Sequence, residues 1–420
     1  MKKYTTILKV MLSHPNMNKF LQSDGIKISL STFIVLIIIW IDGFTFQHID
    51  VTIFTTAIIV LLLDSISNIL KKMLLNFSED RTKLTNDYQS LTSQFQEDWI
   101  QYRNPVGDIQ TFPVIKCMDL KGKNLKILDN PQSMYQLPSE IESFSQELFA
   151  AHSTSTVYNQ LNVRVAKWEH DRNTNQVTII TERTTYFHSL LSNRSMDFPL
   201  SNGMSIRSMI QYGPFFPSLE SSQLSNHLGF NGFLESADNY FVFVKRGSKN
   251  SIGKQTYGNS VGASLKTKYA LNENRIFDNS GLESAILNEI RDELKIEPTS
   301  LEPFDISRNV FAAYRDAVEG GKPQLLFYAK SLLTQAEIDA RFKKVVQKKK
   351  KSTSKERQML EDGEHLFWIS RSELSELAIY PDKLVLTNKN KTLPMVPSAS
   401  SAVVMLLDYL KEQGNENEDY

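Results

Sequence analysis

The chain has 420 residues and balanced charge, with 47 Lys and Arg against 47 Asp and Glu. This balance gives no electrostatic reason to expect a nucleic acid as a partner. The single cysteine, Cys117, excludes a disulfide framework and any cysteine-based zinc site. The seven histidines are scattered along the chain, so a histidine-built metal site is not expected either.

Two apolar stretches, residues 28–46 and 51–70, follow a short N-terminal segment of residues 1–25. Each stretch reaches about 20 residues, the length that crosses about 30 Å of hydrocarbon, if one acid near its end lies among the headgroups. Those acids are Asp42 and Asp64. We therefore predict a transmembrane hairpin over residues 26–70. The alternative, a buried helical hairpin of a soluble protein, is less expected because the first stretch has no polar face.

Basic residues on either side of the hairpin predict its orientation. Five lysines lie in residues 1–27 and four basic residues in 71–83, whereas the connection 43–50 has neither Lys nor Arg. By the positive-inside rule both ends of the chain face the cytoplasm. Everything after the hairpin is then expected in the cytosol.

Residues 71–104 are predicted to form an amphipathic stalk helix. Apolar and aromatic residues recur every three or four positions, as in a coiled-coil seam, and Pro105 and Gly107 end the pattern. The members of this seam are Leu84, Tyr88, Leu91, Phe95, Trp99 and Tyr102. One interpretation is a helix that docks on the following domain. The other is self-association, which would gather several hairpins.

The remaining chain has an α/β pattern in two parts. Residues 105–227 indicate mixed α/β structure of unknown role, with a β-hairpin formed by 162–168 and 176–181. Beyond residue 228, strands are predicted at 240–244, 324–330 and 365–369, and a helix at 281–295.

The helix at 281–295 carries the candidate site. Glu289, Asp292 and Glu293 stand at i, i+3 and i+4, so the three carboxylates share one face. Acids this close repel one another unless a cation lies among them, and Mg²⁺ prefers carboxylate oxygens. All three are candidate metal ligands, with Glu289 and Glu293 as candidate catalytic residues that present a metal-activated water to a phosphate. The alternative is an ordinary acidic surface.

Residues 280–296 resemble the metal-binding box of the Nudix hydrolase superfamily. The stretch reads Asn288-Glu289-Ile290-Arg291-Asp292-Glu293-Leu294-Lys295-Ile296. The order of the surrounding segments is similar as well: a strand ending in Lys245-Arg246, a glycine segment at 257–263, the helix, and two later strands. The resemblance covers residues 228–412 and implies an α/β/α sandwich around a mixed sheet that binds a nucleoside diphosphate or related ligand. Lys245, Arg246 and Lys295 are candidate phosphate contacts.

The box departs from the family pattern at three positions. Asn288, Lys295 and Ser280 stand where the family has arginine, glycine and glutamate. In the family the arginine orients the metal-binding glutamate. The departures therefore favour a domain that binds a nucleotide and cleaves it poorly.

A membrane hairpin joined to a Nudix-like domain resembles one type of effector in the cyclic-oligonucleotide antiphage systems (CBASS) of bacteria. This resemblance implies an inner-membrane homo-oligomer that senses a cyclic nucleotide and disrupts the membrane. A second hypothesis is a membrane-anchored Nudix hydrolase that cleaves nucleoside diphosphate-linked compounds. A third is an interaction protein with no nucleotide affinity.

Overall fold

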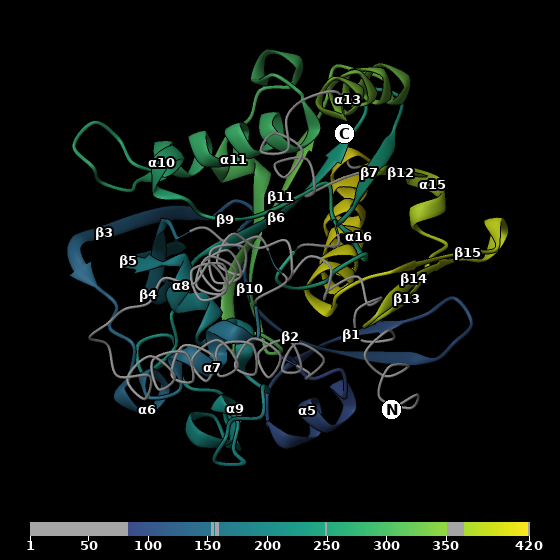
Figure 1. Cartoon of the computed structure of the whole chain (residues 1–420). Helices are drawn as coiled ribbons and strands as arrows, with labels where there is room; N and C mark the ends of the chain where they lie inside the picture. Colours follow the sequence, from purple (N-terminus) through teal and green to yellow (C-terminus); the bar gives the residue numbers. More distant parts are fainter. Residues whose placement is uncertain (1–82, 153–154, 156–158, 248–249, 351–364, 419–420) are drawn as a thin grey trace, which may run out of the picture. The chain divides into compact units, whose positions relative to one another are not determined.

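The computed structural model describes residues 83–152, 155, 159–247, 250–350 and 365–418 (Figure 1). The predicted membrane hairpin, the N-terminal segment and the start of the stalk lie outside these residues. Within the described part of the chain, no helix combines the length and the apolar character needed to span a bilayer. The described residues belong to one compact unit, Asn76–Tyr420.

A nine-stranded sheet forms the centre of this unit, in the order β1-β2-β10-β11-β6-β7-β12, with β8 paired to β7 and β9 paired to β6. Only β11 and β6 run parallel among these pairs. The strands predicted at 240–244, 324–330 and 365–369 are confirmed as β7, β11 and β12. The bounds are β1 (Trp99–Arg103), β2 (Ile109–Asp119), β6 (Gly229–Glu235), β7 (Tyr240–Lys245), β8 (Tyr257–Gly258), β9 (Val261–Ser264), β10 (Val310–Asp316), β11 (Lys322–Lys330) and β12 (His365–Ser370).

Two three-stranded sheets accompany it, and the α/β fold class is confirmed. One has the order β3-β5-β4 and the other β13-β14-β15. Strands β4 and β5 are the predicted hairpin. The bounds are β3 (Asn124–Met134), β4 (Leu161–Asp171), β5 (Gln176–Thr185), β13 (Ala378–Tyr380), β14 (Lys383–Leu386) and β15 (Lys391–Pro394).

The helices are mostly short, and α11 corresponds to the helix predicted at 281–295. They are α5 (Tyr88–Gln94), α6 (Ser139–Glu142), α7 (Ser145–Ala150), α8 (Tyr186–Leu190), α9 (Ile206–Ile210), α10 (Thr267–Ala270), α11 (Asn279–Leu294), α12 (Ile306–Asn309), α13 (Gln335–Lys350), α15 (Arg371–Leu374) and α16 (Pro397–Glu418). Single 3₁₀ turns occupy Asn193–Ser195, Pro298–Ser300 and Thr387–Lys389.

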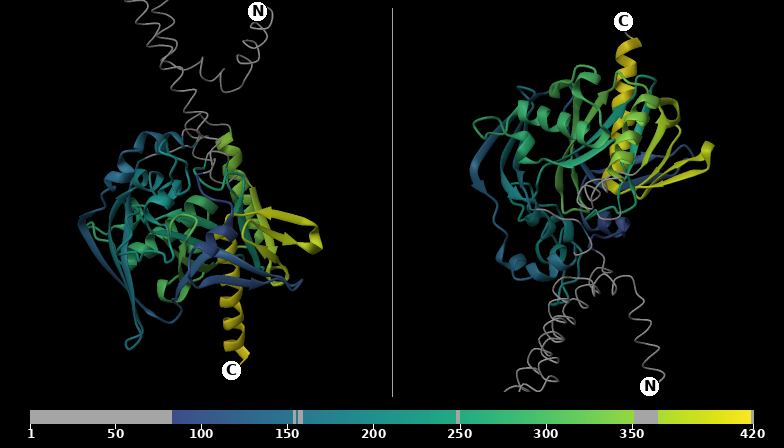
Figure 2. Two further views of the ribbon diagram at one scale, coloured as in Figure 1. Left: turned by 90° about the horizontal axis from the view of Figure 1, so that it is seen from below. Right: turned by 45° about the horizontal axis from the view of Figure 1, so that its top comes forward.

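Helices α11 and α16 pack on opposite faces of the central sheet (Figures 1 and 2). Successive side chains of a strand point to opposite faces. In β6, Phe230 packs in the cluster that contains Ile286 and Ile290 of α11, and Phe233 packs in the cluster that contains the apolar residues of α16. Burying each such aromatic side chain contributes about 1.5–3 kcal/mol. The sheet is therefore covered on both sides.

The predicted stalk helix is wrong over the described residues. Helix α5 ends before Phe95, whose backbone is extended, and the chain then enters β1, which pairs antiparallel with β2. Leu91 and Phe95 are 3 % and 2 % exposed and pack with Phe216. Leu91 and Phe95 are therefore part of the core and are not available for self-association between copies. They pack on the domain, as the docking interpretation expected, but the segment is a short helix and a strand instead of one docked helix.

The predicted boundary at residue 228 falls inside one folded unit. Strand β2, from the region 105–227, pairs with β10 over Asp119 to Val114. Strand β4 of the same region contacts the segment that follows β9, through a hydrogen bond from Val163 N to Leu265 O of 3.2 Å. The middle region therefore completes the same domain.

Candidate functional site

Helix α11 begins and ends at well-defined residues. The Asp278 side chain accepts a hydrogen bond from Gly281 N (2.9 Å) and so caps the first turn. Lys295 ends the helix with φ 63° and ψ 34°, in the left-handed region. Leu282, Ile286 and Ile290 are fully buried. This anchoring leaves the side of α11 that carries the acids facing β9 and α10.

Glu289 is the most buried member of the acid triad, which we define as Glu289, Asp292 and Glu293. It is 3 % exposed, and its Oε1 lies 2.5 Å from the ammonium of Lys266. Burial alone would lower the pKa of Lys266, but the charges and hydrogen bond of the neighbouring glutamates outweigh it and the pKa is raised. Lys266 is therefore charged, and the pair is a partly buried ion pair.

The other two acids also have protein partners. The Tyr269 hydroxyl donates to Asp292 Oδ2 at 2.5 Å, and Glu293 Oε2 accepts a 3.3 Å hydrogen bond from Gly262 N. Burial and the Asp292 carboxylate together raise the pKa of Tyr269 to about 12, so the phenol stays protonated as a donor. Each acid thus bonds to a group from β9, from α10 or from Lys266, which lies between them.

In this structure each acid of the triad is bonded to a protein group. A magnesium ion needs carboxylate oxygens free to form an octahedral shell. One oxygen of Glu289 faces an ammonium, and Asp292 and Glu293 each accept from another donor. Within the described residues, no group of three or more His, Cys, Asp or Glu side chains is placed to hold a metal.

Lys266 and Tyr269 contact the acid triad, although no local sequence pattern predicted either residue for the site. Lys266 precedes α10, and its backbone forms a bridge with Asn162 of β4. Thr267 Oγ1 donates to Leu161 O at 2.9 Å, which ties the start of α10 to the same strand. Because β4 lies about 100 residues earlier in the chain, no local spacing pointed to Lys266.

The three predicted phosphate contacts are spread over two places. Lys245 ends β7, opposite His365 of β12 and Tyr257 of β8, and Arg246 follows it. Lys295 lies at the C-terminus of α11, where its ammonium donates to the carbonyl of Asp292. A cation at this end of a helix interacts favourably with the helix dipole.

Replacing Lys295 with glycine is expected to raise the free energy of unfolding by about 0.5–1 kcal/mol, because glycine adopts positive φ without strain. The measurement is urea denaturation followed by circular dichroism. Lys295→Ala is the matched control, since it removes the side chain and keeps the strained Cβ. Equal stabilisation by alanine and glycine would show that backbone strain at this position is not the cause.

A second group of titratable residues lies near β9 and is mostly buried, and we call it the central polar cluster: Arg194, His227, Glu319 and Lys322. Glu319 Oε2 lies 3.6 Å from Arg194 Nε and 3.5 Å from Lys322 Nζ. Burial lowers the pKa of Lys322, and the charge of Glu319 opposes this. Burial also lowers the pKa of His227 well below 6.5, with Lys322 and Arg194 adding to the effect, so the imidazole is neutral.

Arg194 comes from the middle region and, besides its pairing with Glu319, donates to two neutral hydroxyl groups. Its Nη1 donates to the Tyr186 hydroxyl at 2.7 Å and to Ser251 Oγ at 2.5 Å, and its guanidinium lies 5.0 Å from the Tyr186 ring centroid. Region 105–227 therefore supplies part of this cluster.

Several buried atoms of this neighbourhood lack a hydrogen-bond partner, including His227 Nδ1 and Asn226 Nδ2. Both residues are fully buried. A buried polar atom without a partner costs about 1–3 kcal/mol, and such atoms are uncommon in folded proteins. Both atoms therefore keep unused hydrogen-bonding capacity in this structure.

Strand β9 connects the two groups. Gly262 of this strand donates to Glu293, and Ser264, two residues further on, lies 2.9 Å from His227 Nε2. Residues two apart in a strand are separated by about 7 Å along it. Glu293 of the acid triad and His227 of the central polar cluster are therefore bonded to the same short strand.

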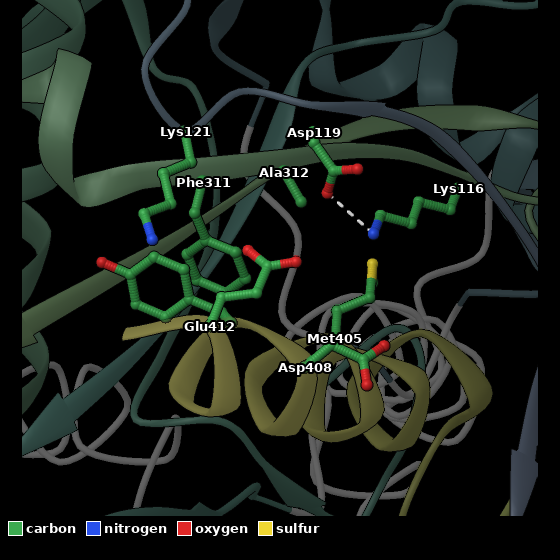
Figure 3. A pocket seen from close by; sticks show the side chains of 9 residues that line it. Lys116, Asp119, Lys121, Phe311, Ala312, Met405, Asp408 and Glu412 are labelled. Carbon is green, nitrogen blue, oxygen red and sulfur yellow. Dashed lines mark ion pairs between the residues drawn. The ribbon is translucent and has the colours of Figure 1, made fainter. Parts of the chain in front are cut away.

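A separate small pocket lies between β2, β10 and α16 (Figure 3). In it Tyr409 stacks on Phe311, with ring centroids 4.3 Å apart, and the Lys121 ammonium lies 5.8 Å from the Tyr409 centroid. Its other lining residues are Lys116, Asp119, Ala312, Met405, Asp408 and Glu412. None of the predicted site residues lines it, and we assign it no role.

Comparison with known proteins leaves the family open. No family model matches the chain, and no curated protein matches it. Among solved structures, the crystal structure of DR0079 from Deinococcus radiodurans is similar at 16 % identity, covering 35 % of this chain and 69 % of that one, with a TM-score of 0.22. A TM-score this low does not establish a shared fold.

Proposed function

We propose that this protein is a membrane-anchored effector whose cytosolic domain binds a cyclic nucleotide and thereby triggers membrane disruption through residues 26–70. The antiviral role and the inner-membrane location are part of this proposal and follow the resemblance to CBASS effectors. The apolar stretches 28–46 and 51–70, with basic residues on both sides, support the membrane part.

The observation that carries the binding part is the central polar cluster. Arginine and lysine are the side chains that recognise phosphate by charge-assisted hydrogen bonds, and Arg194 and Lys322 lie on either side of one carboxylate. A phosphate of the ligand would compete with Glu319 for both cations. Partnerless atoms of His227 and Asn226 nearby add donor and acceptor capacity for the same ligand.

Binding without cleavage is supported by the contacts of the acid triad. Glu289 is buried and paired with Lys266, which leaves it poorly placed for the metal chemistry of a hydrolase. The second candidate function, a membrane-anchored hydrolase of nucleoside diphosphate-linked compounds, is favoured by the common face of Glu289, Asp292 and Glu293 on α11. The two proposals differ in the fate of the ligand.

The mechanism of membrane disruption is proposed to involve several copies of the chain. A ligand shifts a two-state assembly only by binding one state more tightly, with about 1.4 kcal/mol for each tenfold change. The seam at Leu91 and Phe95 is internal, so association has to use other surfaces.

The test uses the full chain in phosphatidylethanolamine–phosphatidylglycerol liposomes that contain a self-quenched dye, with a panel of cyclic and linear nucleotides. We expect an intact cyclic species to be retained, by mass spectrometry after equilibrium dialysis, and the dye to leak only in its presence. Arg194→Gln is expected to weaken retention at least tenfold, because a charged hydrogen-bond donor is lost.

Arg172→Gln is the matched control, since Arg172 lies exposed in the turn between β4 and β5. It is expected to behave as the parent protein. Cleaved ligand that disappears in Glu293→Gln would instead make the protein a hydrolase. If no nucleotide is retained or cleaved, both proposals are wrong and a protein partner becomes the hypothesis to test.

A further inference from the structure

We propose that the Lys266 side chain is the resident cation of the acid triad, so that this domain engages its ligand without a divalent metal. This deepens the proposed function, on which it rests for the identity of the ligand. The occupancy of the triad by metal can be tested without any ligand.

The first argument is the contact itself. Glu289 is 3 % exposed, and a carboxylate this buried requires a positive or hydrogen-bonding partner. The Lys266 ammonium, 2.5 Å from Glu289 Oε1, supplies both the charge and a donor. One fixed charge is therefore placed directly against the most buried acid of the triad.

The second argument is the way Lys266 is held. The residue before it, Leu265, is fully buried, and Leu265 N donates to Leu228 O at 2.8 Å. Its own backbone forms a bridge with Asn162. The start of the side chain is thus fixed by β4 and by the residue that precedes β6. A metal ion at Glu289 would have to displace an ammonium whose backbone is anchored on two sides.

The third argument is that the other donors of the triad are also consistent with a metal-free site. Tyr269 and Gly262 each donate to one of the remaining acids, so every acid of the triad has a protein donor and Lys266 offsets one of the three negative charges. An ammonium carries three N–H donors, and two remain to meet a ligand oxygen when Glu289 takes the first. The triad can then present a positive group to a phosphate with no activated water.

The test is a Mn²⁺ titration of the full chain in detergent, with free Mn²⁺ followed by electron paramagnetic resonance. The parent protein is expected to show no Mn²⁺ binding that is lost in Glu289→Gln. Lys266→Met is expected to bind Mn²⁺ at least tenfold more tightly than the parent, and to show a Mn²⁺-dependent rise in melting temperature that the parent lacks. Lys266→Arg, which keeps the charge, is expected to behave as the parent.

Two results would overturn the proposal. The first is parent protein that binds Mn²⁺ and loses it in Glu289→Gln. The second is Lys266→Met that is folded and gains no Mn²⁺ binding. Should Lys266→Met fail to fold, the double variant Lys266→Met/Glu289→Gln, which leaves no unpaired charge, establishes whether the vacated charge is the reason. In that case the Mn²⁺ titration of the parent protein alone decides whether Lys266 keeps metal out of the acid triad.

Ligand retention separates this proposal from the proposed function. If a cyclic nucleotide is retained equally well with and without EDTA, the result supports both the role of Lys266 and the sensor function. Retention that requires Mg²⁺ contradicts the role of Lys266 and leaves the sensor function standing. Absence of retention contradicts the sensor function, while the Mn²⁺ titrations still decide the role of Lys266.

Discussion

Replacing Asp129 with asparagine is expected to lower the free energy of unfolding by about 3–5 kcal/mol, the range for breaking a buried ion pair by removing one partner. Asp129 lies in β3 and its side chain is fully buried. Its two oxygens accept from Arg183 at 2.7 and 2.6 Å. Urea denaturation at neutral pH measures the change.

The same carboxylate holds the chain that leads into α11. It accepts hydrogen bonds from Thr181 Oγ1 at 2.7 Å and from Phe277 N at 2.9 Å, and Arg183 also donates to Arg275 O at 3.2 Å. The segment before the acid triad is thereby tied to the sheet β3-β5-β4. Loss of this anchor is therefore expected to loosen the start of α11 as well.

The effect of Asp129 depends on pH with a definite sign. Burial alone would raise the pKa of its carboxyl, but the hydrogen bonds from Arg183, Phe277 and Thr181 outweigh it, and the pKa is lowered. A lowered folded-state pKa means that the stabilisation is present above the unfolded value of about 4 and is lost as pH falls through the folded value. The difference in free energy of unfolding between the parent protein and Asp129→Asn is expected to be constant near neutral pH and to become smaller below about pH 4.

Asp119→Asn is the matched control. Its carboxylate forms an ion pair with Lys116 at 2.7 Å, but the side chain is 63 % exposed. Exposed pairs contribute about 0–1 kcal/mol, so little change is expected. Equal losses of unfolding free energy in the two variants would show that burial of the Asp129–Arg183 pair does not increase its contribution to stability.

Replacing Gly281 with alanine is expected to destabilise the domain by about 3 kcal/mol, through overpacking against backbone. A Cβ at this position would lie 1.9 Å from the carbonyl oxygen of Ala270 and 2.9 Å from its carbonyl carbon. Backbone atoms at the end of α10 have to move to relieve the overlap. Since Lys266 and Tyr269 lie at α10, the variant is also expected to weaken their contacts with the acid triad.

Gly414→Ala is the control for Gly281→Ala, because it makes the same change in another helix. A Cβ at Gly414 of α16 meets nothing within 4 Å. Alanine favours helix by up to about 1 kcal/mol over glycine, so this control is expected to be neutral or slightly stabilising. Urea denaturation of both variants, with circular dichroism, measures the difference. A neutral Gly281→Ala would mean that α10 and α11 can separate freely.

Much of the C-terminal part could be predicted from local pattern. The alternation and apolar runs at 240–244, 324–330 and 365–369 are strands, and the periodicity of Leu282, Ile286 and Ile290 is a helix. The apolar pattern of these segments is strong because each segment buries one or both of its faces. The stalk prediction failed because Leu91, Phe95 and Trp99 have a spacing that suits a helix, while β2 offers Trp99 a partner strand.

The sequence by itself determined the α/β class, the position of α11 and the common face of Glu289, Asp292 and Glu293, because a helix places residues i, i+3 and i+4 together whatever surrounds it. Only the tertiary structure decided what meets those acids. Lys266 reaches Glu289 because β4 pairs with the segment after β9. Arg194 reaches Glu319 across 125 residues of chain. Pairings between distant segments depend on the packing of the whole domain, and no local spacing contains them.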